Sequence, residues 1–408
     1  MPVLLAGSAY RRLWAARTVS QCGDVAQFTA LALLAFHLTG SGLGVSGVVI
    51  AEIAPVLLLA PLAGPLVDRL PRVTVMVGAD LARMVLAAVL AVWHRDIALV
   101  YAVAFGLSAG SVFFNPAAGS LLPALVTDDE LVAANSGIWS AAVLSQILVA
   151  PLAGLLTATA GYGWAFAANA ASFAISAIML RGLRTSEAPR PVTTISIWAQ
   201  DREVLHLVVR DRLLRALAVA QTLAALSAGA TSALLVVLAA HSLHTSGGGY
   251  GLLLAAIAVG AFTGPLLLAR LPARTHGPMI VFAAFGLRSL VDLVLATVIA
   301  LPAALGALVC YGIGTSTGNI AFATVIQSHV PDRLRGRVFS AFDLIWQSMR
   351  LTSLLIGGLL ADAAGIRAVY YLGGALLAAA ALAGLTLLGV PGNWRPARAS
   401  HSPASHDH

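Results

Sequence analysis

The acidic residues best placed to do chemistry in this sequence lie inside long apolar segments. Asp24 lies near the middle of its segment, Glu52 has no basic neighbour in its own segment, and Arg350 has no acid within two turns after it. Burying such a charge in lipid costs roughly 3 kcal/mol or more, and an unpaired carboxylate withdrawn from water readily takes up a proton or a cation. We therefore predict that Asp24 and Glu52 bind protons or a cationic substrate, and that Arg350 attracts an anionic group. The alternative is that each forms a structural charge pair between packed helices.

Two further pairs of charges sit within single apolar segments. Asp80 and Arg83 are three residues apart, and Arg288 and Asp292 are four apart. These spacings place both side chains on one face of a helix, where opposite charges neutralise each other. We predict that both are structural charge pairs.

The composition excludes a soluble protein. The 408 residues are 59% hydrophobic and 10% charged, with a mean hydropathy of +0.90. A water-exposed surface needs more charge than this, so the surrounding solvent must be lipid. The net charge of +7 comes from short arginine clusters between apolar runs, which argues for membrane topology signals and against nucleic-acid binding.

Several kinds of chemistry lack the residues they require. All 24 basic residues are arginines, so no lysine is available for a phosphate-binding loop or a Schiff base. Cys22 and Cys310 both lie in apolar segments, so no disulfide framework is expected. We predict that the protein is not an enzyme, uses no cofactor and binds no metal.

Twelve apolar segments of about 20 residues read as membrane-spanning helices. A polar stretch near the middle separates six spans from six. The expected fold is an all-α membrane protein built from two pseudo-symmetric six-helix halves. The predicted spans are 13–38, 44–67, 73–93, 97–118, 131–158, 161–181, 212–240, 249–270, 277–299, 302–328, 336–361 and 366–389.

Internal repeats support the division into halves. Gly64-Pro65-Leu66 recurs as Gly264-Pro265-Leu266, and Arg69-Leu70-Pro71 recurs as Arg270-Leu271-Pro272. Related halves are a common plan of secondary transporters, with the substrate site between them near the midplane. The predicted organisation is an N-terminal half (1–181), a cytoplasmic linker with an amphipathic helix at the inner membrane surface (182–211), a C-terminal half (212–390) and a disordered cytoplasmic tail (391–408).

The orientation follows from the loop arginines. Only Arg95 and Arg367 fall on the side opposite to the N-terminus. Arginines concentrate in cytoplasmic loops, so both termini are predicted to be cytoplasmic, in a multi-pass plasma-membrane protein. The arginines on the predicted cytoplasmic side are Arg11, Arg12, Arg69, Arg72, Arg181, Arg184, Arg190, Arg202, Arg210, Arg212, Arg215, Arg270, Arg274, Arg333, Arg335, Arg337, Arg395 and Arg398.

The loop between the second and third spans carries the sharpest motif. Gly64, Asp68, Arg69 and Arg72 match the pattern G-x-x-x-D-R-x-G-R, with proline in place of the second glycine. This loop resembles the signature of the major facilitator superfamily. A small residue lets helices approach, and an acid at a helix end can pair with arginines or a helix terminus. We predict a gating latch here, with Asp343 as a partner across the inner face; alternatively, Asp343 is a solvated acid at the cavity mouth.

Other segments are similar to the macrolide-efflux and enterobactin-exporter branch of that family. This resemblance implies proton-driven export of drugs, natural products or siderophores, as in multidrug resistance. The fifth span keeps only Ala150-Pro151 and Gly154 of the antiporter signature G-P-x-x-G-G, and the fourth lacks the arginine of many drug/proton antiporters. The matching segments are Arg17 with Gly23-Asp24, Leu38-Thr39-Gly40-Ser41, Ala79 to Arg83, Asn115-Pro116 to Pro123, Ala133-Ala134-Asn135 and Val330 to Phe339.

These observations together predict a secondary active transporter that works by alternating access. We expect a monomeric proton-coupled antiporter in the lipid bilayer that exports a lipophilic or amphipathic small molecule. An importer of a small solute is one alternative. A transporter-derived sensor or assembly subunit that moves nothing is another, although the gating acids argue against it.

The predicted topology can be tested with fusions. An enzyme that reports only from the cytoplasm should give signal when fused near Pro189 or at the C-terminal tail, because both segments lie on the arginine-rich side. A fusion near His94 should be silent, and signal there would overturn the orientation.

Overall fold

The computed structural model describes residues 7–183, 206–270 and 277–388, apart from a few side chains within helices. Twelve of its helices are long and apolar enough to cross a membrane, which confirms the predicted all-α fold with twelve spans. The described residues contain no β-strand. Most of the predicted linker and all of the predicted tail lie outside the described residues.

The N-terminal half contains six long helices, and two short 3-10 turns, η2 (Leu122–Ala124) and η3 (Asp128–Glu130), lead from the fourth to the fifth. The helices start and stop on local signals. Gly40 ends the first with a left-handed backbone (φ 60°), Ser41 caps the second, and Asp96 caps the fourth. The helices are α1 (Ser8–Thr39), α2 (Gly42–Arg69), α3 (Arg72–Val92), α4 (Ile97–Leu121), α5 (Leu131–Thr159) and α6 (Tyr162–Arg181).

The C-terminal half repeats this plan with one break. The seventh predicted span divides at Leu234, where φ and ψ (−87° and 11°) leave the helical range. No proline or glycine stands at Leu234, so no local signal in the sequence indicated the break; the second piece is buried among other helices. The helices are α8 (Arg212–Ala233), α9 (Leu235–His241), α10 (Gly247–Leu268), α11 (Pro278–Thr297), α12 (Leu301–His329), α13 (Asp332–Ala364) and α14 (Ile366–Leu388).

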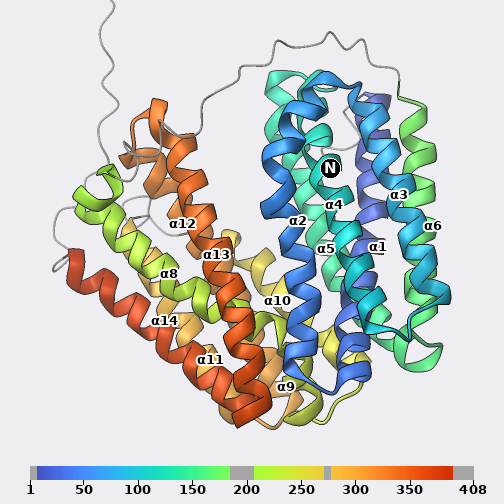
Figure 1. Ribbon diagram of the computed structural model, residues 1–408. Coiled ribbons are helices and arrows are strands. Elements are labelled where there is room, and N and C mark those ends of the chain that lie inside the picture. The colour runs from blue at the N-terminus through green and yellow to red at the C-terminus, as the bar shows by residue number, and fades with distance from the viewer. Residues whose placement is uncertain (1–6, 184–205, 271–276, 389–408) are drawn as a thin grey trace, which may run out of the picture.

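The long helices run up and down, so the molecule has two distinct ends (Figure 1). We call the upper end in Figure 1 the arginine-rich end, because the described arginines that flank the helices gather there. The lower end carries the turn between α1 and α2, the short helix α9 and, of the described arginines that flank the helices, Arg95 and Arg367. We call it the opposite end.

The two halves share a hydrophobic core only toward the opposite end. That shared core joins buried residues of both halves, such as Leu31 and Val103 from one and Leu238 and Leu253 from the other. Toward the arginine-rich end, each half has a separate core, with Leu13 in one and Leu214 in the other. The ribbons of the two halves accordingly diverge toward the top of Figure 1. In the described structure the halves therefore pack together at the opposite end and diverge toward the arginine-rich end.

Small residues allow the halves to approach closely where they meet. A Cβ atom on Gly251 of α10 would overlap the Ala150 carbonyl and Pro151 of α5. A Cβ on Gly154 would likewise overlap the backbone of Gly247. The remnant of the antiporter signature in the fifth span thus lies at a helix contact between the two halves.

Helices α2 and α13 form the second close contact between the halves. They run antiparallel, and the first turns of α2 pack on the last turns of α13, with Gly358 against Leu43 and Ser46. Deeper along the pair, Val49, Ile53 and Leu354 form a small buried cluster with Ala233 of α8. This contact closes the opposite end beside the shared core.

Candidate transport site

A cavity of about 400 Å³ opens in the N-terminal half and is lined by helices α1, α2, α4 and α5. Both acids predicted from the sequence, Asp24 and Glu52, line it and are partly exposed. Amide and hydroxyl side chains supply most of the other polar groups, and no arginine or histidine is part of the wall. The lining residues are Gln21, Asp24, Val25, Gln27, Phe28, Glu52, Ala104, Leu107, Ser108, Ser111 and Gln146.

Asp24 is positioned by a close approach of α1 to α6. Gly23 has no room for a side chain against Asn169 and Ser172, so the two helices pack tightly at this level. Asn169 donates a hydrogen bond to Gln27 (2.6 Å), one turn after Asp24. Asp24 itself forms no ion pair within 4 Å in the described structure.

Glu52 faces the same cavity from α2. The hydroxyl of Ser108 donates to the backbone carbonyl of Glu52 (2.5 Å) and fixes α4 against α2 at this turn. Arg350 of α13 acts electrostatically on Glu52 from the other half, but no ion pair within 4 Å joins them among the described residues. Asp24 and Glu52 therefore share one cavity, with Arg350 outside its wall, and neither acid has an ion-pair partner within 4 Å among the described residues.

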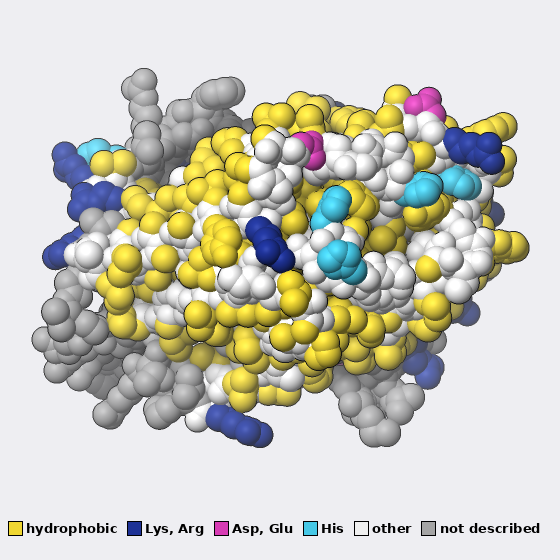
Figure 2. All heavy atoms as spheres, turned by 90° about the horizontal axis from the view of Figure 1, so that it is seen from below, with side chains coloured by type: hydrophobic (Ala, Val, Ile, Leu, Met, Phe, Trp, Pro, Cys, Tyr) yellow, Lys and Arg dark blue, Asp and Glu magenta, His cyan; other side chains and the backbone are white. Residues whose placement is uncertain are grey.

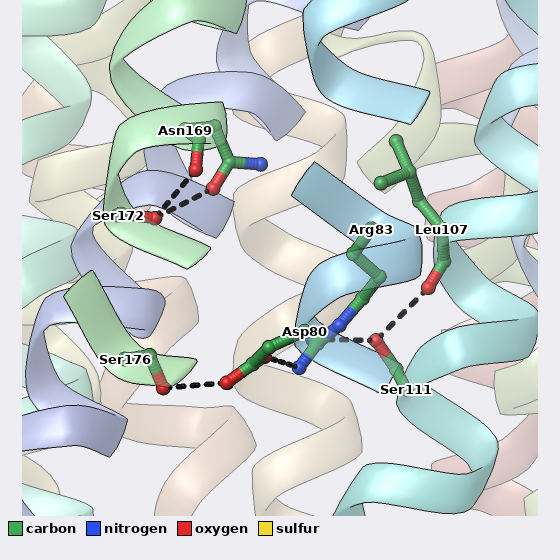
Figure 3. A network of polar contacts seen from close by, with 7 residues as sticks. All are labelled: Asp80, Arg83, Leu107, Ser111, Asn169, Ser172 and Ser176. Atoms are coloured by element: carbon green, nitrogen blue, oxygen red, sulfur yellow. Dashed lines mark hydrogen bonds and ion pairs between the residues drawn. The ribbon is translucent and has the colours of Figure 1, made fainter. Parts of the chain in front are cut away.

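The predicted pair Asp80–Arg83 is a buried ion pair of 2.5 Å on α3 (Figure 3). Ser176 of α6 donates to the second carboxylate oxygen of Asp80 (2.6 Å). The Arg83 guanidinium lies between the rings of Phe114 and Phe173, 4.6 and 4.4 Å from their centroids. These contacts explain how a charged pair is tolerated in an apolar helix bundle.

Arg83 also reaches the cavity wall. It donates to the hydroxyl of Ser111 (3.2 Å), which in turn donates to the carbonyl of Leu107, and both residues line the cavity (Figure 3). The structural pair therefore supports the wall that faces Asp24 and places a fixed positive charge behind it.

The second predicted pair, Arg288 and Asp292, is not a direct ion pair. Arg288 donates to the Tyr311 hydroxyl (3.0 Å) and lies over its ring, and Asp292 accepts from Ser227 (3.2 Å). Both residues are buried on α11, but each finds its polar partner on a neighbouring helix. The spacing in sequence was compatible with a pair, but Asp292 bonds instead to α8 and Arg288 to α12.

The predicted latch residues lie at the arginine-rich end. Arg69 and Asp343 are exposed there, and Arg72 is partly buried. The side chains of Gly64 and Asp68 lie outside the described part of the structure. The described residues therefore do not test whether these residues form a latch.

The sequence analysis missed the neutral polar residues of the cavity. Gln21, Asp24 and Phe28 follow one another at helical spacing on α1, so they share a face. A polar residue one turn before an acid, within an apolar span, was the available signal for this wall. Ser108 and Ser111 on α4 were not distinguishable from serines that only mediate helix packing.

A family model describes almost the whole chain. The model named Major Facilitator Superfamily matches residues 13–354 and 217–407. The chain belongs to the Major Facilitator Superfamily. This assigns it to transporters and confirms the family resemblance seen in the sequence.

Several relatives of this facilitator chain are known efflux proteins or transporters. It is 27% identical over 402 residues to an uncharacterized MFS-type transporter, YfiS of Bacillus subtilis, covering 92% of each chain. It is 29% identical to the multidrug efflux pump Tap of Mycolicibacterium fortuitum, covering 88% of this chain and 90% of Tap. Macrolide efflux protein A of Streptococcus pyogenes matches at 30% over 148 residues, about a third of each protein.

Solved structures share the fold of this facilitator. The nucleoside transporter NupG (D323A mutant) superposes with a TM-score of 0.77 at 14% identity, covering 94% of this chain and 100% of the other. A bacterial homologue of the iron transporter ferroportin in an inward-facing state superposes with a TM-score of 0.72 at 18% identity, covering 93% and 98%. At these identities the likeness concerns the fold alone.

The Asp80–Arg83 pair can be tested through stability. Asp80→Asn should lower the thermal unfolding midpoint of the detergent-purified facilitator strongly, because it leaves a buried guanidinium unpaired, a loss of about 3–5 kcal/mol. Asp292→Asn is the matched control, since its carboxylate makes no direct ion pair, and its loss should be smaller. Equal midpoints for the two variants would contradict this account of the pair.

Proposed function

We propose that this protein is a proton-coupled exporter of a lipophilic or amphipathic small molecule. The observation that carries the proposal is a pair of carboxylates without ion-pair partners, Asp24 and Glu52, on the wall of an interior cavity. An acid held in such a place can exchange a proton or a cation, and because its burial costs free energy it is a candidate functional group. The efflux relatives support outward transport.

The proposed cycle begins from the described state. The arginine-rich end is taken as cytoplasmic, because basic loops are retained on that side. With the halves apart at this end, solute enters from the cytoplasm or the inner leaflet and meets the cavity wall. Closure of this end and opening of the other would then release it outside.

Charge competition at the two acids would couple the fluxes. A proton arriving from outside neutralises Glu52 or Asp24 and weakens its hold on a cationic group of the solute. After the change of state, release of the proton inside restores a negative wall that attracts the next solute. Arg350 would attract an anionic group of the solute or help to reset the carboxylates as they lose their protons.

The remaining features of the proposal follow from the sequence. The transporter would act as a monomer in the plasma membrane, with both termini in the cytoplasm, and would need no cofactor beyond the proton gradient. Asp68, Arg69 and Arg72 would latch the arginine-rich end when it closes, with Asp343 as their partner on α13. The signature glycine, Gly64, would give α2 the close approach that this closure needs.

Glu52→Gln is the decisive variant for proton coupling. It mimics the protonated acid at nearly constant volume, so efflux driven by an imposed pH difference should collapse while exchange at equal pH partly survives. The measurement is efflux from proteoliposomes of ethidium, as a lipophilic cation, and of a macrolide. Glu130→Gln, outside the cavity, should behave as the parent protein.

The same assay decides between the two acids. Asp24→Asn should lower efflux of the cationic probe more than that of a neutral one. Full pH-driven efflux in Glu52→Gln would make Glu52 a structural acid and leave the proton to Asp24.

The latch is tested by non-additivity. Asp68→Asn should reduce transport strongly without removing the protein from the membrane, and adding Asp343→Asn should cost less than two independent losses, because paired groups couple. Transport rates of the two single variants and the double variant measure this coupling. Asp129→Asn, an exposed acid in the turn before α5, is the control. Parental flux in Asp68→Asn would remove the latch from the mechanism.

A further inference from the structure

The opposite end of the molecule is joined by an acid that the sequence analysis did not single out. Asp362 lies near the last turn of α13 and contacts the beginning of α2, in the other half. Its carboxylate accepts from the Ser41 hydroxyl (2.5 Å) and from the backbone N–H groups of Gly42 (2.6 Å) and Leu43 (3.3 Å). Three hydrogen bonds therefore run from one half to one side chain of the other.

These bonds complete the cap of α2. The first N–H groups of a helix have no partner within it. The Ser41 hydroxyl accepts hydrogen bonds from the N–H groups of Leu43 and Gly44 (3.1 and 3.3 Å), as an N-cap residue does. The Asp362 carboxylate accepts from the N–H of Gly42 and also from the N–H of Leu43. The start of α2 is thus capped jointly by its own half and by the other half.

The position of Asp362 is unfavourable in its own helix. It stands two residues before the end of α13, where the helix dipole repels a negative charge. The start of α2 is the positive end of a helix dipole, so it offsets this repulsion only while the two halves are in contact. Gly42 and Gly358 allow that contact, because a Cβ on either would crowd the other helix.

We propose that Asp362 is the gating residue of the opposite end, which holds that end shut in the described state and must release α2 before the cavity can open there. Its partners are backbone N–H groups and one serine, so the gate needs no basic residue. It rests on alternating access between the halves but not on the direction of transport or the identity of the solute. It would serve an importer equally.

The surroundings of Asp362 suit a gate that opens. Asp362 lines a surface depression of about 570 Å³, together with Ser41, His241 and Arg367. The space-filling view of this face shows histidine, basic and acidic side chains around its hollowed middle (Figure 2). Water therefore reaches the three hydrogen bonds and can replace them when the helices separate.

The antiparallel pair α2 and α13 carries an acid near the C-terminal end of each helix. Asp68 is the last residue but one of α2, at the arginine-rich end, as Asp362 is near the end of α13. Closure of one end would engage one acid while the other is free. The gate at Asp362 is thus the counterpart, on the other side of the membrane, of the latch proposed at Asp68.

The gate can be tested without any substrate by thiol labelling in nanodiscs, where both faces meet water. The reporter is Ser46→Cys, fully buried against α13, in a background with Cys22→Ser and Cys310→Ser. Asp362→Asn should raise the rate of labelling by a maleimide about five- to tenfold. Loss of a charged helix cap costs the closed state about 1 kcal/mol, and this raises the population of the open state by about that factor.

Asp96→Asn is the matched control for this measurement. Asp96 also caps a helix at the opposite end, donating nothing and accepting from Ala98, but within its own half. It should leave the labelling rate unchanged. If Asp362→Asn labels at the parental rate, or if Asp96→Asn accelerates labelling as much, the gate is refuted.

A cross-link provides an independent measurement. The double variant Ser41→Cys/Asp362→Cys places two thiols where the side-chain oxygens are 2.5 Å apart. Oxidation should link the halves, and labelling of a third cysteine at position 46 should then fall below the parental rate and recover with reductant. Linked protein that still labels at the parental rate would show that this contact does not control opening and would overturn the proposal.

The substrate experiments fail independently of this one. Loss of pH-driven efflux with normal labelling would concern the cavity acids alone. Faster labelling in Asp362→Asn would support the gate even if neither ethidium nor a macrolide is exported.

Discussion

Hydrocarbon neither hydrates a charge nor hydrogen-bonds a backbone. Every charged residue within the spans therefore needs a polar partner or contact with water. The Arg83 side chain contacts a carboxylate, two aromatic rings and a serine. The Arg288 side chain contacts a tyrosine on the next helix. Asp24 and Glu52 form no ion pair within the described part of the chain and instead face a cavity. The same physical rule thus separates the charges that hold the bundle together from those available to a ligand.

The contact between the halves has the opposite character at its two ends. At one end, glycines bring α5 against α10 and α2 against α13, and both halves contribute to one core. At the other end, each half keeps its own core, so it can separate without exposing that core. In the proposed change of access, each half would move as a unit and the shared core near α9 would have to reorganise.

The sequence predicted the architecture well because lipid imposes a strong and simple pattern on it. Length and hydropathy alone located all twelve spans, and the acids of the cavity were recognisable as charges where charge is costly. What failed depended on contacts between helices distant in sequence. The break at Leu234 lies in an alanine-rich stretch without a local signal, and Arg288 bonds to Tyr311 rather than to the nearer Asp292. The sequence alone could not distinguish Asp362 from other acids near helix ends, because its partners lie on α2, far away in the chain.

The choice of basic residues has an electrical consequence. All of them are arginines, which keep their charge at any physiological pH, and the described histidines lie at or beyond helix ends. Among the charged side chains of the described spans, the carboxylates are therefore the groups that can gain or lose a charge near neutrality. An unloaded cavity that turns across the membrane carries its negative charge through part of the membrane potential. A full crossing is worth about 2.3 kcal/mol per charge at 100 mV. In the proposed cycle, loading Asp24 and Glu52 with protons or a cation would remove that work, so the membrane voltage would distinguish the loaded carrier from the empty one.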